Sequence, residues 1–324
     1  MAETESWAFP GNLQPDPADY DFPLAAALDA LVLVRTEIPE DAFTAPILGT
    51  ERAGNGVVIR DDGLVLTIGY LITEASAVWL TTSRGVAVAG TPLAYDQATG
   101  FGLVQPLGRL GVPARARGSA ASCSVGDEVI VAGHGGRAHA LKANVVARRE
   151  FAGYWEYVLD EAIFTAPAHP QWGGSALSGD QGKLLGIGSL LVQEQVDDKN
   201  VQGNMIVPID LIEPILGDLL KFGARSGAPR AWLGLYASEV RGMLAVAGVA
   251  PRGPADRAQI RTGDLVLEVG GRRVTALADL FRAVWQLGPA GTDVPLTISR
   301  DGKVSHVSVR SGDRHDFLKK PHLH

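Results

Sequence analysis

The residue types best suited to covalent chemistry gather in residues 169–178, which run His-Pro-Gln-Trp-Gly-Gly-Ser-Ala-Leu-Ser. A serine hydroxyl becomes a nucleophile when a neighbouring base takes its proton, and this stretch offers Ser175 and His169 for the two roles. The paired glycines predict a tight bend, and the apolar residues 183–191 that follow predict a strand. One interpretation of the stretch is therefore a hydrolase with Ser175 as its nucleophile.

Two other chemistries have weaker signals in the sequence. The glycine cluster in residues 133–136 is followed by no Gly-Lys-Ser/Thr and by no helix signal, which favours a β-turn over a phosphate-binding loop. His134 and His139 lie in the same region, but a metal site needs three or four convergent ligands and the spacing supplies none. We therefore expect no metal and no cofactor.

The elements that must position these residues are mostly strands. The chain has 324 residues, of which 46% are hydrophobic and 39 are glycine, and this length predicts two or three domains. Short β-branched runs separated by turn residues predict a largely β protein, as in the hairpin formed by residues 56–60, the turn at 61–63 and residues 64–67. Residues 223–229 are rich in Gly, Ala, Ser and Pro, which predicts a linker.

Three separated motifs of the first part resemble those of the HtrA, or Deg-type, trypsin-like serine proteases. In this resemblance Gly173 stands at the position of the nucleophilic serine, Tyr70 at that of the catalytic histidine, and Gly100 at that of the aspartate that orients the histidine. Asp96 matches an earlier aspartate of the family, and an extended segment would hold it roughly 13 Å from Gly100, too far to replace the missing carboxylate. The motifs span residues 66–72, 93–104 and 170–187.

The second part resembles the PDZ domain of the same family. Residues 231–235 resemble its carboxylate-binding loop, and residues 249–271 resemble its later motifs in the same order. The resemblance implies that backbone N–H groups of the loop meet the carboxylate of a peptide, whose last side chain enters an apolar pocket. The peptide-binding residues implied are Leu233, Gly234, Leu235 and Phe281.

The resemblance implies a pseudoprotease, which keeps the protease fold as a peptide- or protein-binding scaffold and uses its PDZ domain for binding. A glycine cannot attack a carbonyl, and a phenol with a pKa near ~10 is a poor general base at neutral pH. The alternative is an active HtrA-like serine endopeptidase with Ser175 as a relocated nucleophile. Spacing disfavours it, because Gly182 lies nine residues after Gly173, as in the family, but seven after Ser175.

The fold expected is mainly β, a trypsin-like double β-barrel followed by an α+β PDZ domain. Its parts are an N-terminal segment over residues 1–45, partly disordered with a short helix from Pro23 to Val34, the protease-like domain 46–222, the linker 223–229, the PDZ domain 230–311 and the tail 312–324.

Charge and cysteine content bound the partners and the compartment. The net charge of −7 disfavours nucleic acid and anionic membranes as partners, which leaves protein or peptide C-termini and, by analogy with the family, a homo-oligomer. The start of the chain lacks the basic residues of a secretory signal, and Asp29 breaks its best apolar run. Cys123 is the only cysteine, which excludes an internal disulfide and fits a reducing compartment. We therefore predict a cytoplasmic protein.

Overall fold

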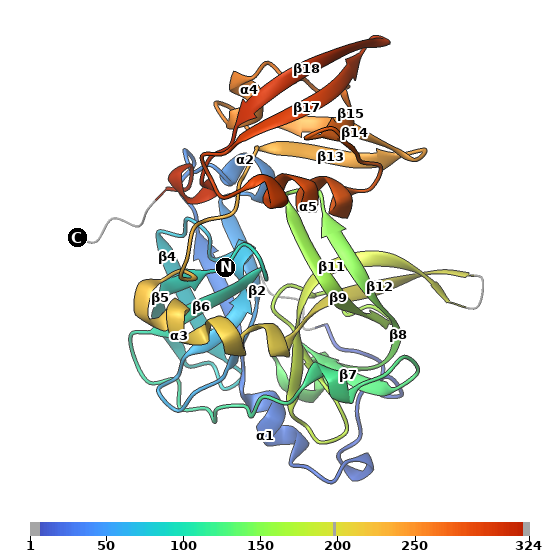
Figure 1. The fold of residues 1–324 in the computed structure, drawn as a ribbon. Helices are drawn as coiled ribbons and strands as arrows, with labels where there is room; N and C mark the ends of the chain where they lie inside the picture. The colour runs from blue at the N-terminus through green and yellow to red at the C-terminus, as the bar shows by residue number, and fades with distance from the viewer. Residues whose placement is uncertain (1–6, 197–198, 320–324) are drawn as a thin grey trace. The chain divides into compact units, whose positions relative to one another are not determined.

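The structure is a computed structural model that describes residues 7–196 and 199–319. Most of its regular structure is strand, which confirms the mainly β class (Figure 1). The chain divides into two compact units. Within the described residues, the first unit comprises residues 7–149 and 161–225, and the second comprises residues 150–160 and 226–319.

The first unit contains two closed, antiparallel barrels, as a trypsin-like fold requires. The first barrel has the strand order β1-β2-β3-β6-β5-β4, and the second has the order β10-β11-β12-β9-β8-β7. The first is built from β1 (Leu31–Glu37), β2 (Glu51–Val58), β3 (Val65–Ile68), β4 (Ala77–Thr82), β5 (Ala87–Tyr95) and β6 (Phe101–Pro106). The second is built from β7 (Glu128–Ala132), β8 (Ala140–Gly153), β9 (Tyr157–Ala166), β10 (Ala176–Ser178), β11 (Leu184–Val196) and β12 (Lys199–Pro208).

The first barrel begins at Leu31, ahead of the boundary at residue 46 that the sequence suggested. The helix expected from Pro23 to Val34 is shorter: α1 covers Leu24–Asp29, and the chain then enters β1. Burial alternates along the end of β1, where Val34 and Thr36 are buried while the residues after each of them are exposed. That two-residue period belongs to a half-buried strand and overrides the helical spacing of the leucines. The short helix α2 (Ala45–Leu48) separates β1 from β2.

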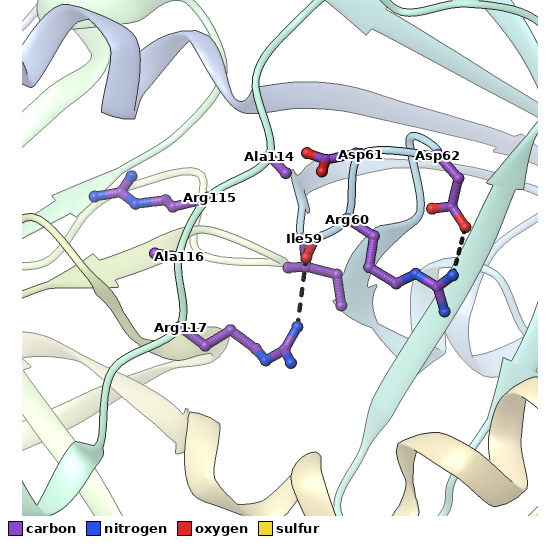
Figure 2. A pocket seen from close by; sticks show the side chains of 8 residues that line it. All are labelled: Ile59, Arg60, Asp61, Asp62, Ala114, Arg115, Ala116 and Arg117. Carbon is purple, nitrogen blue, oxygen red and sulfur yellow. Dashed lines mark hydrogen bonds and ion pairs between the residues drawn. The ribbon is translucent and has the colours of Figure 1, made fainter.

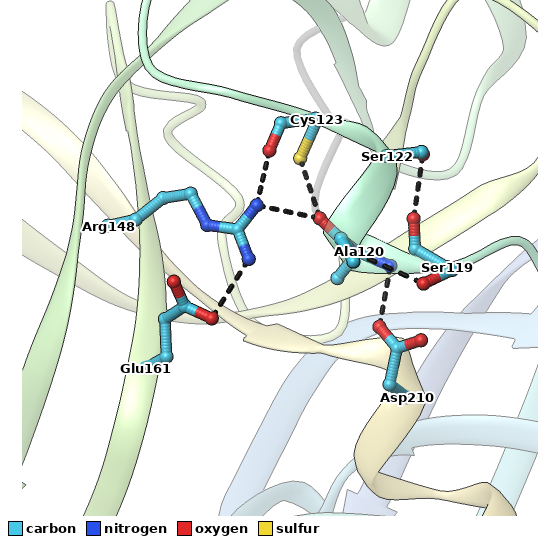
Figure 3. A network of polar contacts seen from close by, with 8 residues as sticks. Ser119, Ala120, Ser122, Cys123, Arg148, Glu161 and Asp210 are labelled. Atoms are coloured by element: carbon cyan, nitrogen blue, oxygen red, sulfur yellow. Dashed lines mark hydrogen bonds and ion pairs between the residues drawn. The ribbon is translucent and has the colours of Figure 1, made fainter.

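A polar network holds the segment before β7 against the second barrel (Figure 3). The Arg148 guanidinium donates to the carbonyls of Ala120 and Cys123 and to the carboxylate of Glu161. The Ala120 N–H donates to the carboxylate of Asp210, in the 3-10 turn before α3 (Glu213–Phe222). Cys123 is buried beneath this network, and burial raises the pKa of its thiol, so the cysteine is part of the packing.

The PDZ unit is a single antiparallel sheet with two short helices. The strand order is β13-β14-β15-β17-β18, with β16 paired to β15, so that β13 is an edge strand. Helix α5 buries one apolar face, which includes Leu277, Leu280, Phe281 and Val284. Its elements are β13 (Leu235–Val240), β14 (Met243–Val249), α4 (Pro254–Arg257), β15 (Leu265–Val269), β16 (Arg272–Arg273), α5 (Leu277–Leu287), β17 (Asp293–Arg300) and β18 (Lys303–Arg310).

Both ends of the described chain make contacts with the rest of the structure. Phe9 donates its backbone N–H to the carbonyl of Ala138 at 2.9 Å, and the Trp7 ring meets the His139 ring edge-on at 4.4 Å. At the other end, the Phe317 ring lies 4.7 Å from that of Trp232. Residues 1–6, on which part of the predicted disorder falls, lie outside the described residues, as do residues 320–324. Among the residues described, no helix combines the length and the apolar composition that crossing a membrane requires.

Candidate functional site

The loop that leads into β10 brings Gly173 against Tyr70. A Cβ added to Gly173 would lie 2.7 Å from the Tyr70 hydroxyl oxygen, so the phenol fills the space beside this glycine. The hydroxyl donates to the backbone carbonyl of Ser189 in β11 at 2.9 Å. Burial raises the pKa of Tyr70, and the phenol is therefore a neutral hydrogen-bond donor rather than a base.

Gly100 lies beside the turn that carries Tyr70. The N–H of Gly69, at the start of that 3-10 turn, donates to the Gly100 carbonyl at 2.7 Å. The structure thus brings together the three positions that the sequence aligned with a catalytic triad. Gly100 has φ +81°, a left-handed conformation that suits glycine, and it presents no side chain to Tyr70.

Asp96 is closer to Gly100 than an extended segment would allow. Residues 96–100 form a turn in which the Gly100 N–H donates to the Asp96 carbonyl at 2.8 Å, so the expected separation of roughly 13 Å was wrong. The carboxylate nevertheless turns to other partners. It accepts from the N–H and the hydroxyl of Thr99, at 2.9 and 2.6 Å, and pairs with Arg225 at 2.9 Å.

Arg52 holds the turn that carries Tyr70 by hydrogen bonds to its backbone carbonyls. Its guanidinium donates to the carbonyls of Tyr70 (2.6 Å) and Thr73 (3.2 Å) and to the hydroxyl of Thr44 (2.7 Å). Burial of this side chain lowers the pKa of Arg52 to about 10, which still leaves it charged at neutral pH. The position of Tyr70 is therefore set by a buried cation that the sequence analysis had not singled out.

Asn55 holds the glycine-rich loop, and the sequence analysis missed it. Its amide nitrogen donates to the carbonyls of Gln171 (2.8 Å) and Gly173 (3.2 Å), and its backbone N–H donates to Gly173 at 2.7 Å. Gly174 must be a glycine, because it has φ +75° and a Cβ there would lie 1.7 Å from the Asn55 carbonyl oxygen. The signal available was a polar residue between Gly54 and Gly56, just before the apolar end of the strand.

His169 uses both ring nitrogens on the backbone. The Gln171 N–H donates to Nδ1 at 3.1 Å, and Nε2 lies 3.0 Å from the carbonyl oxygen of His139. These partners fit a neutral imidazole with its proton on Nε2, and burial lowers the pKa of His169 to about 4. The ring is a structural part of the loop.

Ser175 does not meet His169. The serine is fully buried, and its Oγ makes no hydrogen bond within the described structure. It packs against Gly188, where an added Cβ would lie 2.1 Å from Oγ. The structure therefore does not assemble the pair of residues that the alternative interpretation needs.

The loop of the PDZ unit converges on a carboxylate, as the sequence suggested, but the carboxylate is internal. The N–H groups of Leu233, Gly234 and Leu235 point at the side chain of Glu156, with the shortest bond, 2.8 Å, from Gly234. Gly234 has φ +68°, and a Cβ there would lie 2.9 Å from the Trp232 ring. Phe281 is buried beneath, its ring 6.1 Å from that of Trp285.

One further hollow is lined by charged groups, and its three arginines all have bonded partners. Its arginines are paired: Arg60 with Asp62 at 2.8 Å and Arg117 with Glu213 at 2.7 Å. Arg115 donates to the hydroxyl of Ser178 and to backbone carbonyls, which explains its burial. In the described part of the chain no group of three or more His, Cys, Asp or Glu side chains could hold a metal ion. The 510 Å³ pocket is lined by Ile59, Arg60, Asp61, Asp62, Ala114, Arg115, Ala116 and Arg117 (Figure 2).

Comparison with known proteins identifies both units. Residues 54–187 match the trypsin-like peptidase domain, and residues 231–310 match the PDZ domain. The chain is 24% identical over 279 residues, 82% of its length, to a probable periplasmic serine endoprotease, DegP-like, of Halomonas elongata. It is 23% identical over 271 residues, 79% of its length, to the periplasmic serine endoprotease DegP of Escherichia coli. The chain belongs to the HtrA-type family.

Solved HtrA-type structures have the same fold. The HtrA-type protease AlgW with a tripeptide superposes with a TM-score of 0.53 at 18% identity, covering 95% of this chain and 98% of that one. The serine endoprotease from Yersinia pestis superposes with a TM-score of 0.52 at 20% identity, covering 90% of this chain and 98% of that one. The HtrA-type chain spans 57% of the length of the Halomonas relative and 56% of that of the E. coli relative.

The relatives correct one prediction about this HtrA-type chain. We predicted a cytoplasmic location, but the relatives just described are periplasmic proteases, and this finding overturns the prediction. A single cysteine has no internal partner in either compartment, so its presence does not distinguish a reducing from an oxidising one.

Proposed function

We propose that this HtrA-type chain is a catalytically inactive homologue that binds the carboxyl-terminal ends of proteins or peptides through its PDZ domain. One observation carries the proposal: the Tyr70 hydroxyl occupies the space in which a side chain on Gly173 would begin. Acyl transfer requires a nucleophile, a base and an oxyanion hole in fixed geometry. Gly173 offers no nucleophile, and Tyr70 is a neutral donor rather than a base.

The backbone of the loop supports the same proposal. An oxyanion hole needs N–H groups that point to the developing negative charge. The Gln171 N–H instead donates to Nδ1 of His169 at 3.1 Å. The carbonyls of Gln171 and Gly173 are held by Asn55, which opposes a rearrangement of the loop.

An active serine endoprotease is the second candidate, because the relatives carry that name. It would require a relocated nucleophile, for which Ser175 is the candidate in the loop. The burial of Ser175, its unpartnered Oγ and the engagement of both ring nitrogens of His169 weigh against it. Because the relatives are named as periplasmic proteases, we further propose that this protein is periplasmic. We also propose that it self-associates, which light scattering would test.

The test of inactivity uses the full chain with casein and with a fluorophosphonate probe. We expect casein turnover at the background rate and no labelled serine. Labelling that disappears in Ser175→Ala would establish the second candidate and overturn inactivity.

The test of binding uses calorimetry of the full chain with short peptides that end in apolar residues, each as a free acid and as an amide. We expect the acids to bind more tightly, because the loop offers three N–H donors to a carboxylate. Equal binding of acid and amide would count against carboxylate capture.

A further inference from the structure

A side-chain carboxylate lies where the terminal carboxylate of a peptide is expected to bind. Oε1 of Glu156 accepts from the N–H groups of Gly234 (2.8 Å) and Leu235 (3.3 Å), and both oxygens lie 3.2 Å from the N–H of Leu233. Glu156 is only 6% exposed. A buried carboxylate is tolerated only when hydrogen bonds replace its water, and this loop supplies three donors.

The carboxylate reaches the loop from the tip of a hairpin. Strand β8 ends at Gly153 and β9 begins at Tyr157, and Glu156 lies in the turn between them. Glu156 has φ +65°, a left-handed conformation that few non-glycine residues adopt. Such a conformation persists when surrounding contacts hold it. The N–H groups of the loop donate to this side chain, and Arg314 adds an electrostatic attraction.

The same hairpin tip contacts both elements that border the peptide site. The ring of Tyr154 lies 6.1 Å from that of Tyr236 in the edge strand β13. Arg282 of α5 pairs with Glu150 and Asp160, one on each side of the turn. Below the turn, Val158 is buried in the apolar cluster that contains Leu233, Leu235, Phe281 and the rest of the PDZ core.

We propose that Glu156 is an internal ligand of the PDZ loop, and that it closes the loop to peptide carboxylates until the turn 154–156 is displaced. The inference rests on the proposed binding of peptide C-termini at residues 233–235. A terminal carboxylate and the Glu156 carboxylate are the same chemical group and need the same three N–H donors, so only one can be bound at a time. The observed affinity for a peptide is reduced by the fraction of molecules whose loop is open.

The experiment compares the full-length wild-type chain with Glu156→Ala. Binding is measured by fluorescence anisotropy with labelled short peptides that end in a free apolar residue and with their amides. If about one loop in ten is open in the wild type, the substitution tightens binding of the acids about tenfold and leaves the amides unchanged. Glu161→Ala is the matched control, because Glu161 lies further along β9 and pairs with Arg148.

Hydrogen exchange of the same proteins reports on the contact without any peptide. We expect the amides of residues 233–235 to exchange faster in Glu156→Ala and at the wild-type rate in Glu161→Ala. Glu156→Gln keeps the size of the side chain without the charge, so it separates loss of the carboxylate from loss of packing if the alanine variant folds poorly.

The outcomes separate this inference from the proposed function. Equal affinity of the wild type and both Glu156 variants for the acids would overturn the inference while peptide binding stands. Unchanged exchange of residues 233–235 would also overturn it, because the loop would then be open in the wild type. A third outcome is faster exchange in Glu156→Ala while no variant binds any peptide acid. That result would overturn the proposed peptide binding, and the role of Glu156 as a competitor would then be overturned too.

Discussion

At the residue scale, the Tyr70 hydroxyl lies beside Gly173, the position that aligns with the nucleophile of the family. The Tyr70 hydroxyl is bonded to the Ser189 carbonyl, and a Cβ at position 173 would lie only 2.7 Å from it. The inactivity that we propose would therefore involve the packing at this position as well as the absence of three catalytic side chains. The space that a nucleophile needs is filled, and Arg52 holds the filling group in place through the Tyr70 carbonyl.

Gly173→Ser should restore no protease activity and should destabilise the protein. The new Cβ meets the Tyr70 hydroxyl at 2.7 Å, and overpacking of this kind costs about 1–3 kcal/mol. Urea denaturation measures the loss, and casein turnover should stay at background because no base or orienting carboxylate is added. Gly217→Ser is the control, since a Cβ at Gly217 meets nothing within 4 Å. Casein turnover by Gly173→Ser above that of the control would contradict the prediction.

The pH dependence of peptide binding should follow Glu156. Burial raises the pKa of Glu156 from 4.5 to about 7, although the N–H groups of the loop and Arg314 oppose the rise. Burial likewise raises the pKa of the nearby Tyr236, so that phenol does not titrate in this range. A raised pKa means that the contact is most stable below 4.5 and weakens as the pH rises through about 7.

Wild-type affinity for a free peptide acid should therefore increase from about pH 5 to about pH 8, because the peptide carboxylate stays ionised while the Glu156 contact weakens. Anisotropy titrations across this range measure the effect. Glu156→Ala should show a flat profile. A wild-type profile that is flat or falls with pH would be evidence against the internal carboxylate as the competing group.

At the scale of elements, the β8–β9 hairpin has two roles along its length. Its base belongs to the second barrel, while residues 150–160 group with the PDZ unit. Arg282 of α5 holds both sides of the tip by ion pairs with Glu150 and Asp160. The hairpin therefore contacts the PDZ loop through the turn that contains Glu156, and Arg282 of α5 holds the two sides of that turn.

Arg282→Ala should open the loop by loosening the hairpin. Each exposed ion pair contributes about 0.2–1 kcal/mol. Loss of both pairs should therefore tighten peptide binding by roughly two- to tenfold. The effect of Glu156→Ala is the upper limit, because that substitution removes the competing carboxylate itself. Hydrogen exchange in residues 150–160 should quicken in parallel. The control is Arg272→Ala, whose side chain bonds to Gln286 on the same helix. Weaker peptide binding by Arg282→Ala would show that the hairpin supports the site instead of closing it.

At the scale of the whole molecule, chain order and compact units do not coincide. The PDZ unit contains a segment, residues 150–160, that comes well before the linker at residues 223–229. Its apolar core includes Val158 from that segment, and its loop includes Glu156 as a bonded partner. The PDZ unit is therefore completed by a part of the chain that its sequence motifs do not cover.

Cleavage in the linker should leave the PDZ fragment bound to the rest of the chain. We would insert a specific protease site between Gly227 and Ala228, where a Cβ on Gly227 meets nothing within 4 Å. After cleavage, gel filtration should show one peak that contains both fragments, because residues 150–160 remain packed in the PDZ unit. The double variant Glu156→Ala, Arg282→Ala should release more of the PDZ fragment. If the two fragments of the cleaved parent chain eluted entirely in separate peaks, that result would contradict this grouping.

The sequence was sufficient for the order of the domains and for the local geometry of two loops. The bend at residues 173–174 and the loop at residues 231–235 depend on glycines and short motifs, which act over a few residues and can be recognised locally. The same local motifs aligned Tyr70, Gly100 and Gly173, which the structure brings together. The start of the first barrel could not be predicted from the local pattern, because the apolar run that begins at Leu24 also fits a helix. Pairing of β1 with β2 and β4, which are distant in sequence, makes its second half a strand.

Only the tertiary structure decided what the PDZ loop holds. Glu156 and Gly234 are 78 residues apart, and nothing in the residues around Glu156 marks it as a ligand. The contact depends on the length of β8 and β9, on the left-handed turn between them and on burial that excludes water. The hydrogen bonds from Asn55 to Gln171 and Gly173 in the glycine-rich loop span even longer separations, of 116 and 118 residues. Such contacts form because buried polar groups need hydrogen-bond partners, and the fold determines which groups are within reach. The sequence around each residue therefore does not predict its distant partner.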